Sequence, residues 1–467
     1  MRSKKWMKYL QRKKMFKKLL IPKQIVTVNS KNDILTGHAV EIENGVIKKI
    51  APVKDFENYD GEILRYPDYT LIPGFIQTHI HLCQTLFRGF ADDLELLDWL
   101  QKRIFPFENS HTKNSLRASV KLGLNDLISG GTTTILDMGT LRNQEIIFEE
   151  LTASGMRAFA GNCMMDQNEL YPSFRESTEW NLKSTYEWAK AFHDSNNGKI
   201  KFGFAPRFVL SCSEKLLRDT KAMMKDFPDS VFHTHSSENK LEVETVRRMT
   251  GKENVEYFDS IGILDSHTVL AHCIHLNDTE VKTLKKKSAR ISHCPSSNMK
   301  LGSGVADIPK YLKDGISVSL GADGAPCNNG LSAFNEMRLA ALIQKPVHGP
   351  TAMDSLTVFR LATIEGAKAL HIEKAVGSIE IDKKADLVLL DLERADQPLQ
   401  LDNSSVPTDE NQIYSSIVYS ASKENVKSVL LDGNFVVNEG NNLLYDEKKI
   451  LADAKKEFTQ LLKTINN

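Results

Sequence analysis

Two histidines separated by one residue close an apolar, β-type segment early in the sequence. His79 and His81 end the segment Gly74–His81, which begins directly after Pro73. Because alternate residues of a strand face the same side, both imidazoles can bind one cation. A His-X-His pair alone is a weak signal, but its place at the end of an apolar strand favours a metal site. The chemistry expected there is activation of a water molecule by a divalent ion.

A second histidine ends another such segment. His235 closes Val231–His235, and Glu238 follows in the next turn of chain. A neutral imidazole suits zinc or iron, so we expect His235 on the metal ion and Glu238 beside it. A protonated Glu238 could then donate to a ring nitrogen of a substrate. His233 lies on the same face of the segment but deeper, and we expect it to be a packed, hydrogen-bonded core histidine.

Two further β-type segments end in groups of the same kind. His272 closes the apolar segment Thr268–His272, and Asp323 closes Ser317–Asp323. Any one of these side chains could be a hydrogen-bonded core group, as most buried polar groups are. Four segments that all end in such residues favour a shared site instead. His275, in the loop after His272, is expected to be structural or exposed to solvent.

The elements that must position these side chains alternate along the chain. From residue 70 onward, short β-type segments alternate with longer amphipathic helical segments. Eight such units are typical of a (β/α)₈ barrel of the TIM type, which places its active site at the carboxyl ends of its strands. The expected strands are Gly74–His81, Thr132–Asp137, Arg157–Asn162, Ile200–Pro206, Val231–His235, Thr268–His272, Arg290–His293 and Ser317–Asp323.

Strand-like segments of a different character lie on both sides of the barrel region. The sequence therefore predicts an α/β protein in which a small β-sandwich domain is built from both chain ends, at 22–70 and 376–450. The catalytic barrel would occupy 71–375, and a helix at 451–467 would end the sequence. The polar, Pro-containing segment Gln397–Asn411 is expected to be a loop.

The composition is that of an ordinary globular protein. The 467 residues are 41% hydrophobic and 26% charged, with 60 Lys+Arg against 60 Asp+Glu. Nine basic residues and no acid fall in 1–20, which leaves 51 basic against 60 acidic groups in the remainder. A mildly acidic body is not typical of nucleic-acid-binding proteins. We expect neither a nucleic-acid partner nor, without an apolar run of about 18 residues, a transmembrane helix.

The basic segment 1–21 is expected to be a disordered extension. Its longest apolar run, Leu19-Leu20-Ile21, is too short for a signal peptide. The alternative is an amphipathic helix at a membrane surface, with Trp6, Leu10, Phe16 and Leu20 as its apolar residues. Six cysteines without a Cys-X-X-Cys pair are not a disulfide framework in a chain of this length, so a cytoplasmic location is expected.

The order His-X-His, His-X-X-Glu, His and Asp resembles the amidohydrolase superfamily, in its branch of cytosine, guanine and adenosine deaminases and triazine hydrolases. The resemblance covers about residues 22–450 and includes the turn Gly131–Thr134 and the exit stretch Gly377–Val388. A lysine that bridges two metal ions in other branches has no match near Arg207. The resemblance thus implies one divalent ion, zinc or else iron, with His79, His81, His235 and Asp323 as ligands and Glu238, His272 and Asp323 as catalytic residues.

The resemblance leaves two substrate classes open. The stretch from Arg88 to Glu108 is similar to deaminases of 5′-deoxyadenosine, methylthioadenosine and S-adenosylhomocysteine, in which the position of Glu108 accepts hydrogen bonds from ribose hydroxyls. The run Gly324–Gly330 looks closer to the 5′-deoxyadenosine group as well. Gln84 and Arg207 resemble guanine deaminase instead. Arg207 could bind a purine oxygen or an anionic tail, or pair with a neighbouring acid.

We therefore expect a metal-dependent hydrolytic deaminase of an adenosine-type nucleoside that releases ammonia. Its expected substrate contacts are Gln84, Glu108, Arg207 and Glu238. Guanine deaminase is the alternative, followed by a triazine-type chlorohydrolase and a barrel protein without catalysis. The expected partner is a small purine or nucleoside, and assembly into a homo-oligomer stays open.

Overall fold

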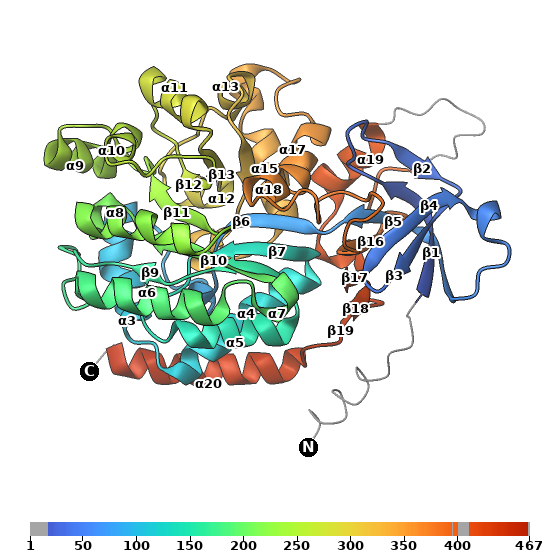
Figure 1. Ribbon diagram of the computed structural model, residues 1–467, viewed down its shortest axis with the longest axis horizontal. Coiled ribbons are helices and arrows are strands. Elements are labelled where there is room, and N and C mark those ends of the chain that lie inside the picture. Colours follow the sequence, from blue (N-terminus) through green and yellow to red (C-terminus); the bar gives the residue numbers. More distant parts are fainter. Residues whose placement is uncertain (1–16, 395, 400–410, 466–467) are drawn as a thin grey trace.

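The structure, a computed structural model, describes residues 17–394, 396–399 and 411–465. A barrel wrapped in helices and a smaller β-sheet lie side by side, and the sheet takes strands from both ends of the sequence (Figure 1). The expected combination of an α/β barrel with a β-domain from both chain ends is confirmed. No helix in these described ranges is both long and apolar enough to cross a membrane.

Eight parallel strands form the barrel, and all eight lie where the sequence predicts them. The eighth strand is split into β14 and β15; β14 pairs with β13 and β15 pairs with β6, which closes the ring. A short β9 (Cys163–Met164) extends the third strand and pairs with β10. The barrel strands are β6 (Phe75–His81), β7 (Thr132–Asp137), β8 (Arg157–Ala160), β10 (Ile200–Pro206), β11 (Val231–Ser236), β12 (Thr268–His272), β13 (Arg290–His293), β14 (Val318–Leu320) and β15 (Asp323–Gly324).

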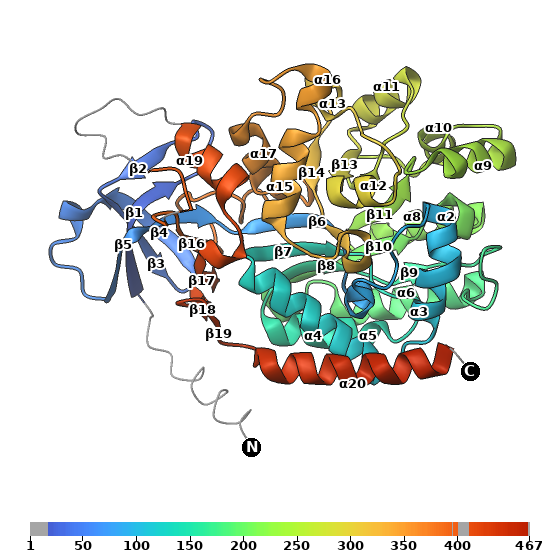
Figure 2. The same cartoon turned by 180° about the vertical axis from the view of Figure 1, so that it is seen from behind.

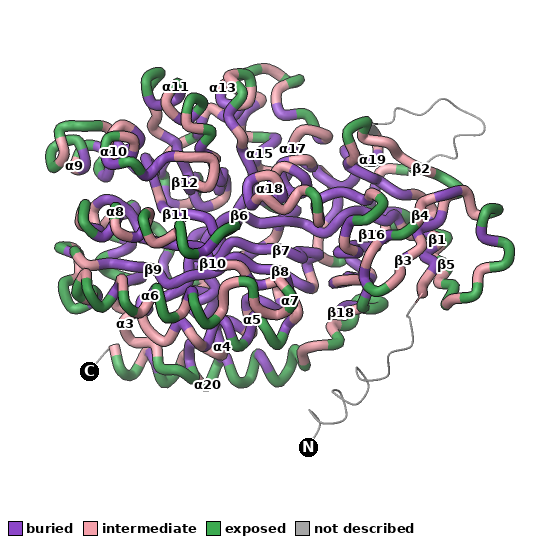
Figure 3. The backbone as a smooth tube through the Cα atoms, in the orientation of Figure 1, coloured by how far each residue is buried: buried purple, intermediate pink, exposed green. Residues whose placement is uncertain are grey.

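Helices cover the outside of the barrel, with their inner faces buried and their outer faces exposed (Figure 3). Polar side chains set several of their first turns: Thr112 caps α4 by accepting from the backbone N–H of Ser115, and Asn277 caps α11. The longer helices are α4 (Lys113–Ser129), α5 (Gln144–Ser154), α6 (Thr178–Phe192), α8 (Glu214–Met223), α9 (Lys240–Thr250), α10 (Asn254–Ser260), α11 (Asp278–Lys287), α15 (Ala333–Leu342), α17 (Ser355–Leu361) and α20 (Glu447–Ile465).

One mixed sheet of nine strands makes up the smaller domain. Its two sequence-distant halves meet where β5 pairs antiparallel with β16. Buried side chains from both halves, such as Leu71 and Leu387, share one apolar core. From this sheet the chain returns to the barrel as α20, which packs along α4 (Figure 2). The strands are β1 (Lys17–Val26), β2 (Ile34–Thr36), β3 (His38–Glu43), β4 (Val46–Pro52), β5 (Glu62–Pro73), β16 (Leu387–Asp391), β17 (Val426–Leu431), β18 (Asn434–Asn438) and β19 (Asn441–Asn442).

Strand β1 begins at Lys17, inside the segment 1–21 that the sequence assigns to a disordered extension. Leu19 and Leu20 are buried, so the apolar end of this basic segment belongs to the sheet core. In the sequence, the apolar run 19–21 is weighed as part of a signal peptide, whereas the structure uses it at the start of a buried strand. Residues 1–16, with the rest of the expected extension, and 400–410 of the expected loop lie outside the described residues.

Candidate functional site

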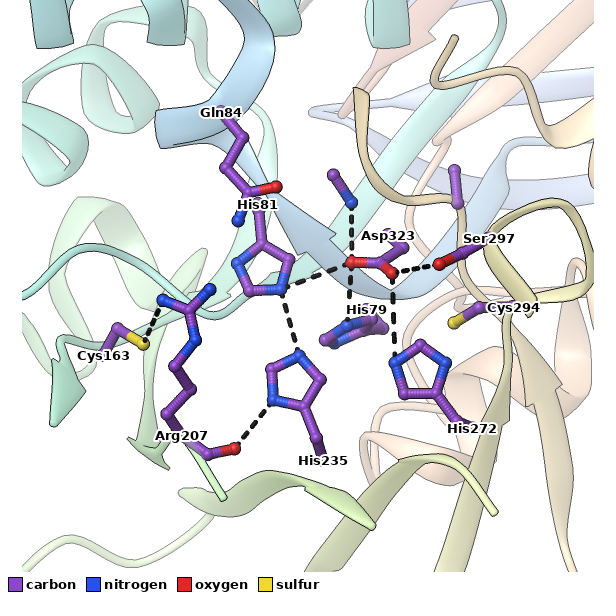
Figure 4. Close-up of polar contacts among 12 residues, drawn as sticks. His79, His81, Gln84, Cys163, Arg207, His235, His272, Cys294, Ser297 and Asp323 are labelled. Atoms are coloured by element: carbon purple, nitrogen blue, oxygen red, sulfur yellow. Dashed lines mark hydrogen bonds and ion pairs between the residues drawn. The ribbon is translucent and has the colours of Figure 1, made fainter. Parts of the chain in front are cut away.

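Four side chains meet at the carboxyl end of the barrel. His79 and His81 come from β6, His235 from β11 and Asp323 from β15, and their ligand atoms all lie within 4.8 Å of one another (Figure 4). Nε2 of His81 lies 3.3 Å from Nε2 of His235, and Asp323 Oδ1 lies 3.2 Å from Nε2 of His79. All four side chains are buried or nearly so. The structure thus brings together the four residues that the resemblance implies as metal ligands.

The backbone of the eighth strand is shaped to bring Asp323 to this point. A Cβ at Gly321, between β14 and β15, would lie 2.8 Å from the backbone of His79, so the close approach to β6 requires glycine. Asp323 itself has φ of 63°, in the left-handed region, and His272 at the end of β12 has φ of 71°. Such strained backbone is costly and gathers at functional sites.

Hydrogen bonds on the outer side of the histidines direct their free nitrogens inward. Nδ1 of His235 lies 2.7 Å from the carbonyl oxygen of Arg207, to which it donates, so the lone pair of Nε2 faces the centre. Nδ1 of His79 lies 2.8 Å from Nε2 of His233, and Nε2 of His79 faces Asp323 Oδ1. His233 is therefore a buried, hydrogen-bonded histidine, as expected, but its partner is a predicted ligand.

The electrostatics of the four residues suit a divalent ion. Burial lowers the pKa values of His79, His81 and His235, which keeps the imidazoles neutral. Burial opposes the charge of Asp323, but contacts with His79 and His81 outweigh it and hold the pKa of Asp323 well below its usual range. Two neutral imidazole nitrogens 3.3 Å apart need a proton or a cation between them. Three neutral nitrogens and a carboxylate are a donor set for zinc or iron.

Glu238 and His272 stand next to these four residues. Nε2 of His272 lies 3.4 Å from Glu238 Oε2 and 3.9 Å from Asp323 Oδ2. Burial, reinforced by the nearby Asp323 and Glu242, raises the pKa of Glu238 well above its usual value. Burial thus favours the protonated form of Glu238, which is the state that a proton donor needs.

Two residues of α12 (Pro295–Lys300) that were not predicted from the sequence support this arrangement. Asn298 Oδ1 lies 2.8 Å from Nδ1 of His272, which donates to it. Ser297 Oγ donates to Asp323 Oδ2 over 2.6 Å (Figure 4). These contacts fix the tautomer of His272 and the orientation of the Asp323 carboxylate. The only available signal was a pair of small polar residues after the seventh strand, which is common in loops.

Gln84, Glu108 and Arg207 form one buried network beside the metal ligands. Arg207 Nη1 and Nη2 lie 2.8 and 3.3 Å from the two oxygens of Glu108, and Gln84 Nε2 donates to Glu108 Oε1 over 2.7 Å. The Arg207 guanidinium also lies over the ring of Phe105. Glu108 resembles nucleoside deaminases and Arg207 resembles guanine deaminase, but in the structure the two side chains form an ion pair with each other.

A cavity opens beside the metal ligands His81, His235 and Asp323. Its polar wall consists of His81, Gln84, Arg207, His235, Glu238 and Asp323. Its apolar wall consists of Leu96, Trp99, Leu100 and Phe208. Glu108 is not among the lining residues, and its side chain is 1% exposed. Of the expected substrate contacts, the structure therefore places Gln84, Arg207 and Glu238 on the cavity and Glu108 behind it.

We expect His233→Ala to weaken zinc binding by about 10- to 100-fold, because an outer hydrogen bond that orients a metal-binding histidine has an effect of this size. Competition with a chelator measures the affinity directly. His293→Ala is the matched control, since His293 is an equally buried barrel histidine whose ring nitrogens have no hydrogen-bond partner. Unchanged zinc affinity in the His233 variant would show that this contact only fills space.

Comparison with known proteins extends over almost the whole chain. Residues 70–436 match the pattern of the amidohydrolase family. A 5′-deoxyadenosine deaminase of Methanocaldococcus jannaschii is 36% identical over 442 residues, covering 94% of this chain and 99% of that protein. A zinc-containing adenosine deaminase from Xanthomonas campestris superimposes with a TM-score of 0.87 at 26% identity, covering 96% of this chain and 98% of the other. An atrazine chlorohydrolase from Arthrobacter aurescens reaches 0.84 at 19% identity, covering 94% and 100%.

Proposed function

The chain belongs to the amidohydrolase family, and we propose that it is a metal-dependent deaminase of adenosine-type nucleosides, of the 5′-deoxyadenosine class. The observation that carries the proposal is the buried carboxyl group of Glu238, whose pKa burial raises, beside four convergent ligand atoms. Hydrolysis of an aromatic C–NH₂ bond needs a proton on the ring, and Glu238 can deliver it. The full-length similarity to a 5′-deoxyadenosine deaminase supports the nucleoside class.

His79, His81, His235 and Asp323 would hold one zinc ion, a choice supported by the zinc in the adenosine deaminase from Xanthomonas campestris. When bound, the ion supplies Lewis-acid activation of a water molecule near neutral pH. A second group of potential ligand atoms, on His81, Cys83 and Glu108, is a poor cation site because the Arg207 guanidinium already pairs with Glu108. One ion per chain is therefore expected.

The side chains divide the proton transfers between them. Glu238 donates its proton to N1 of the purine, which makes C6 electrophilic. The Asp323 carboxylate accepts a proton from the attacking water, and His272, held by Asn298, orients that water. A C6–O bond forms, Asp323 passes its proton to the amine, the C6–N bond breaks and ammonia leaves. The proton of the C6 hydroxyl returns to Glu238 as the C6 carbonyl forms.

Guanine deaminase is the second candidate, and one observation favours it. Gln84 Nε2 is committed to Glu108, so Gln84 presents only its oxygen to the cavity, next to the donors of Arg207. An acceptor beside a donor is complementary to the N–H and C=O of an oxopurine. The chlorohydrolase alternative has weaker support, since 19% identity indicates a shared fold alone.

The six cysteines of the chain are buried and free. This supports the reducing cytoplasm as the compartment, as expected from their spacing.

If the polar network binds ribose, Glu108→Ala will raise KM for 5′-deoxyadenosine by about 10- to 150-fold, the cost of a lost charged hydrogen bond. The same variant leaves Arg207 buried without its partner, so melting temperature and zinc content are measured alongside KM. Nucleosides that lack the 2′- or 3′-hydroxyl should show a similar loss with the wild-type enzyme. The two losses should not add.

A different pattern would favour guanine. In that case Arg207→Ala abolishes guanine deamination. The rise in KM on Glu108→Ala is then the same for substrates with and without ribose hydroxyls. Such a result would reject the nucleoside assignment and keep the deaminase chemistry.

A further inference from the structure

A buried glutamate that does not line the cavity, Glu336 of α15, lies behind the catalytic residues. Its residue is 1% exposed, and no lysine, arginine or histidine among the described residues forms an ion pair with it. Burial raises the pKa of Glu336 to about 7, although hydrogen bonds from Ser296 oppose this rise. Because burying a carboxyl group without a cation is costly, the groups that Glu336 contacts should explain why an acid stands here.

Each oxygen of Glu336 accepts a hydrogen bond from a different segment. Oε2 accepts from the backbone N–H of Ser296 over 3.1 Å, and Oε1 accepts from Nδ2 of Asn328 over 3.4 Å. Ser296 lies in the first turn of α12, whose N-cap residue Cys294 provides no side-chain hydrogen bond. Helix α15, which packs against α12 (Figure 2), therefore supplies the acceptor that this turn lacks.

The turn that Glu336 holds carries both side chains that orient catalytic groups. Ser297 follows Ser296 directly and donates to Asp323 Oδ2 over 2.6 Å (Figure 4). The next residue, Asn298, accepts from Nδ1 of His272 over 2.8 Å. A displacement of the first turn of α12 would therefore move both contacts together.

Asn328 connects Glu336 to the backbone at Asp323. It ends the short helix α14 (Ala325–Asn328), which begins two residues after Asp323. Besides its bond to Glu336, Asn328 Nδ2 donates to the carbonyl oxygen of Ala322 over 2.6 Å. Ala322 directly precedes Asp323, whose φ is 63°. The left-handed backbone that presents the Asp323 carboxylate is thus held from the same glutamate as the side chain of Ser297.

We propose that Glu336 is a positioning residue that fixes Asp323 and His272 at the metal site, through the first turn of α12 and through Asn328. A carboxylate is needed because both of its oxygens accept, whereas a glutamine turns an NH₂ group toward one of the two donors. The inference concerns how the chain holds its own side chains, and it rests on the proposed function only for its kinetic test.

Glu336→Gln tests the proposal, because it keeps the shape of the side chain. Competition with a chelator should show zinc affinity reduced by about tenfold, the lower end of the effect of an outer hydrogen-bond partner. At saturating zinc, kcat on 5′-deoxyadenosine should fall by about tenfold, since misplaced catalytic groups slow the reaction. KM should stay within about twofold, because Glu336 does not line the cavity.

Glu280→Gln is the matched control. Glu280 is a buried glutamate with a pKa raised to about 7, and it accepts from the backbone N–H of Val255 at the start of another helix. The control loses hydrogen bonds of the same kind, so its melting temperature is expected to fall by a similar amount. Its zinc affinity and kcat should equal those of the wild type.

Ser297→Ala, alone and combined with Glu336→Gln, tests the route of the effect. If Glu336 acts through Ser297, the loss of kcat in the double variant is smaller than the product of the two single losses. Losses that multiply fully, or wild-type zinc affinity and kcat in Glu336→Gln, would overturn the proposal. A rise in KM as large as the fall in kcat would overturn it as well.

Asn328→Ala covers the case in which Glu336→Gln does not fold, because Asn328 is only half-buried. This variant should lower zinc affinity and kcat by about fivefold each, the effect of one lost hydrogen bond, with KM unchanged. Wild-type values of both would contradict the proposal. Zinc affinity is measured without substrate, so a wild-type protein that releases no ammonia from any adenosine would contradict the proposed function alone.

Discussion

Glu238→Gln lowers kcat on 5′-deoxyadenosine by about 10²- to 10⁴-fold while zinc content stays at the wild-type level. Glutamine keeps the shape of the side chain but has no acidic proton to give to the purine ring. Burial raises the pKa of Glu238 and so favours the protonated form that this transfer requires. Steady-state kinetics together with elemental analysis of the same preparation provide both numbers.

Glu280→Gln is the matched control for this variant. Glu280 is also a buried glutamate, and burial raises its pKa to about 7, but it caps α11 and does not line the cavity. Its kcat should stay within about twofold of the wild type, as for substitutions away from the site. Near-native turnover of Glu238→Gln would show that Glu238 takes no part in the mechanism. Loss of zinc from this variant would show that Glu238 is a metal ligand.

His79→Ala and Asp323→Ala each remove the bound ion and lower activity by at least about 10³-fold, because the metal supplies several kcal/mol of transition-state stabilisation. Each deletion takes one of only four ligand atoms from the cluster. Elemental analysis should find about one zinc per chain in the wild-type protein and much less in the two variants.

His275→Ala provides the comparison, since His275 lies in the loop after β12 and its Nε2 bonds the carbonyl oxygen of Ser303. It should retain both the ion and the activity. Two tightly held ions per wild-type chain would contradict the single-ion site. Full zinc occupancy in His79→Ala would contradict the assignment of His79 as a ligand.

The barrel could be predicted from local pattern because each of its strands is an apolar segment bounded by helix. The predicted ends of β7, β10, β12 and β13 coincide with the structure. The four-residue cluster could be predicted for the same reason: the residues that follow the apolar stretch of a strand lie at one end of the barrel. The start of β1 could not be predicted, because the residues around Lys17 are mostly basic and do not show the apolar pattern of a buried strand.

Side-chain contacts between residues far apart in the sequence could not be predicted. Glu108 and Arg207 are 99 residues apart, and their ion pair depends on how α3 packs against the end of β10. Asn298 has no distinctive neighbours in the sequence, and its role follows from its contact with His272 alone. The expected position of His233 was right, whereas its contact with His79 required the folded structure.

Ammonia release by the zinc-loaded protein, measured with 5′-deoxyadenosine and with guanine at equal concentrations, tests the central claim most directly. We expect stoichiometric ammonia and the matching inosine-type product from 5′-deoxyadenosine, and little ammonia from guanine. Rapid turnover of guanine with none of 5′-deoxyadenosine, or no ammonia from either compound, would contradict it.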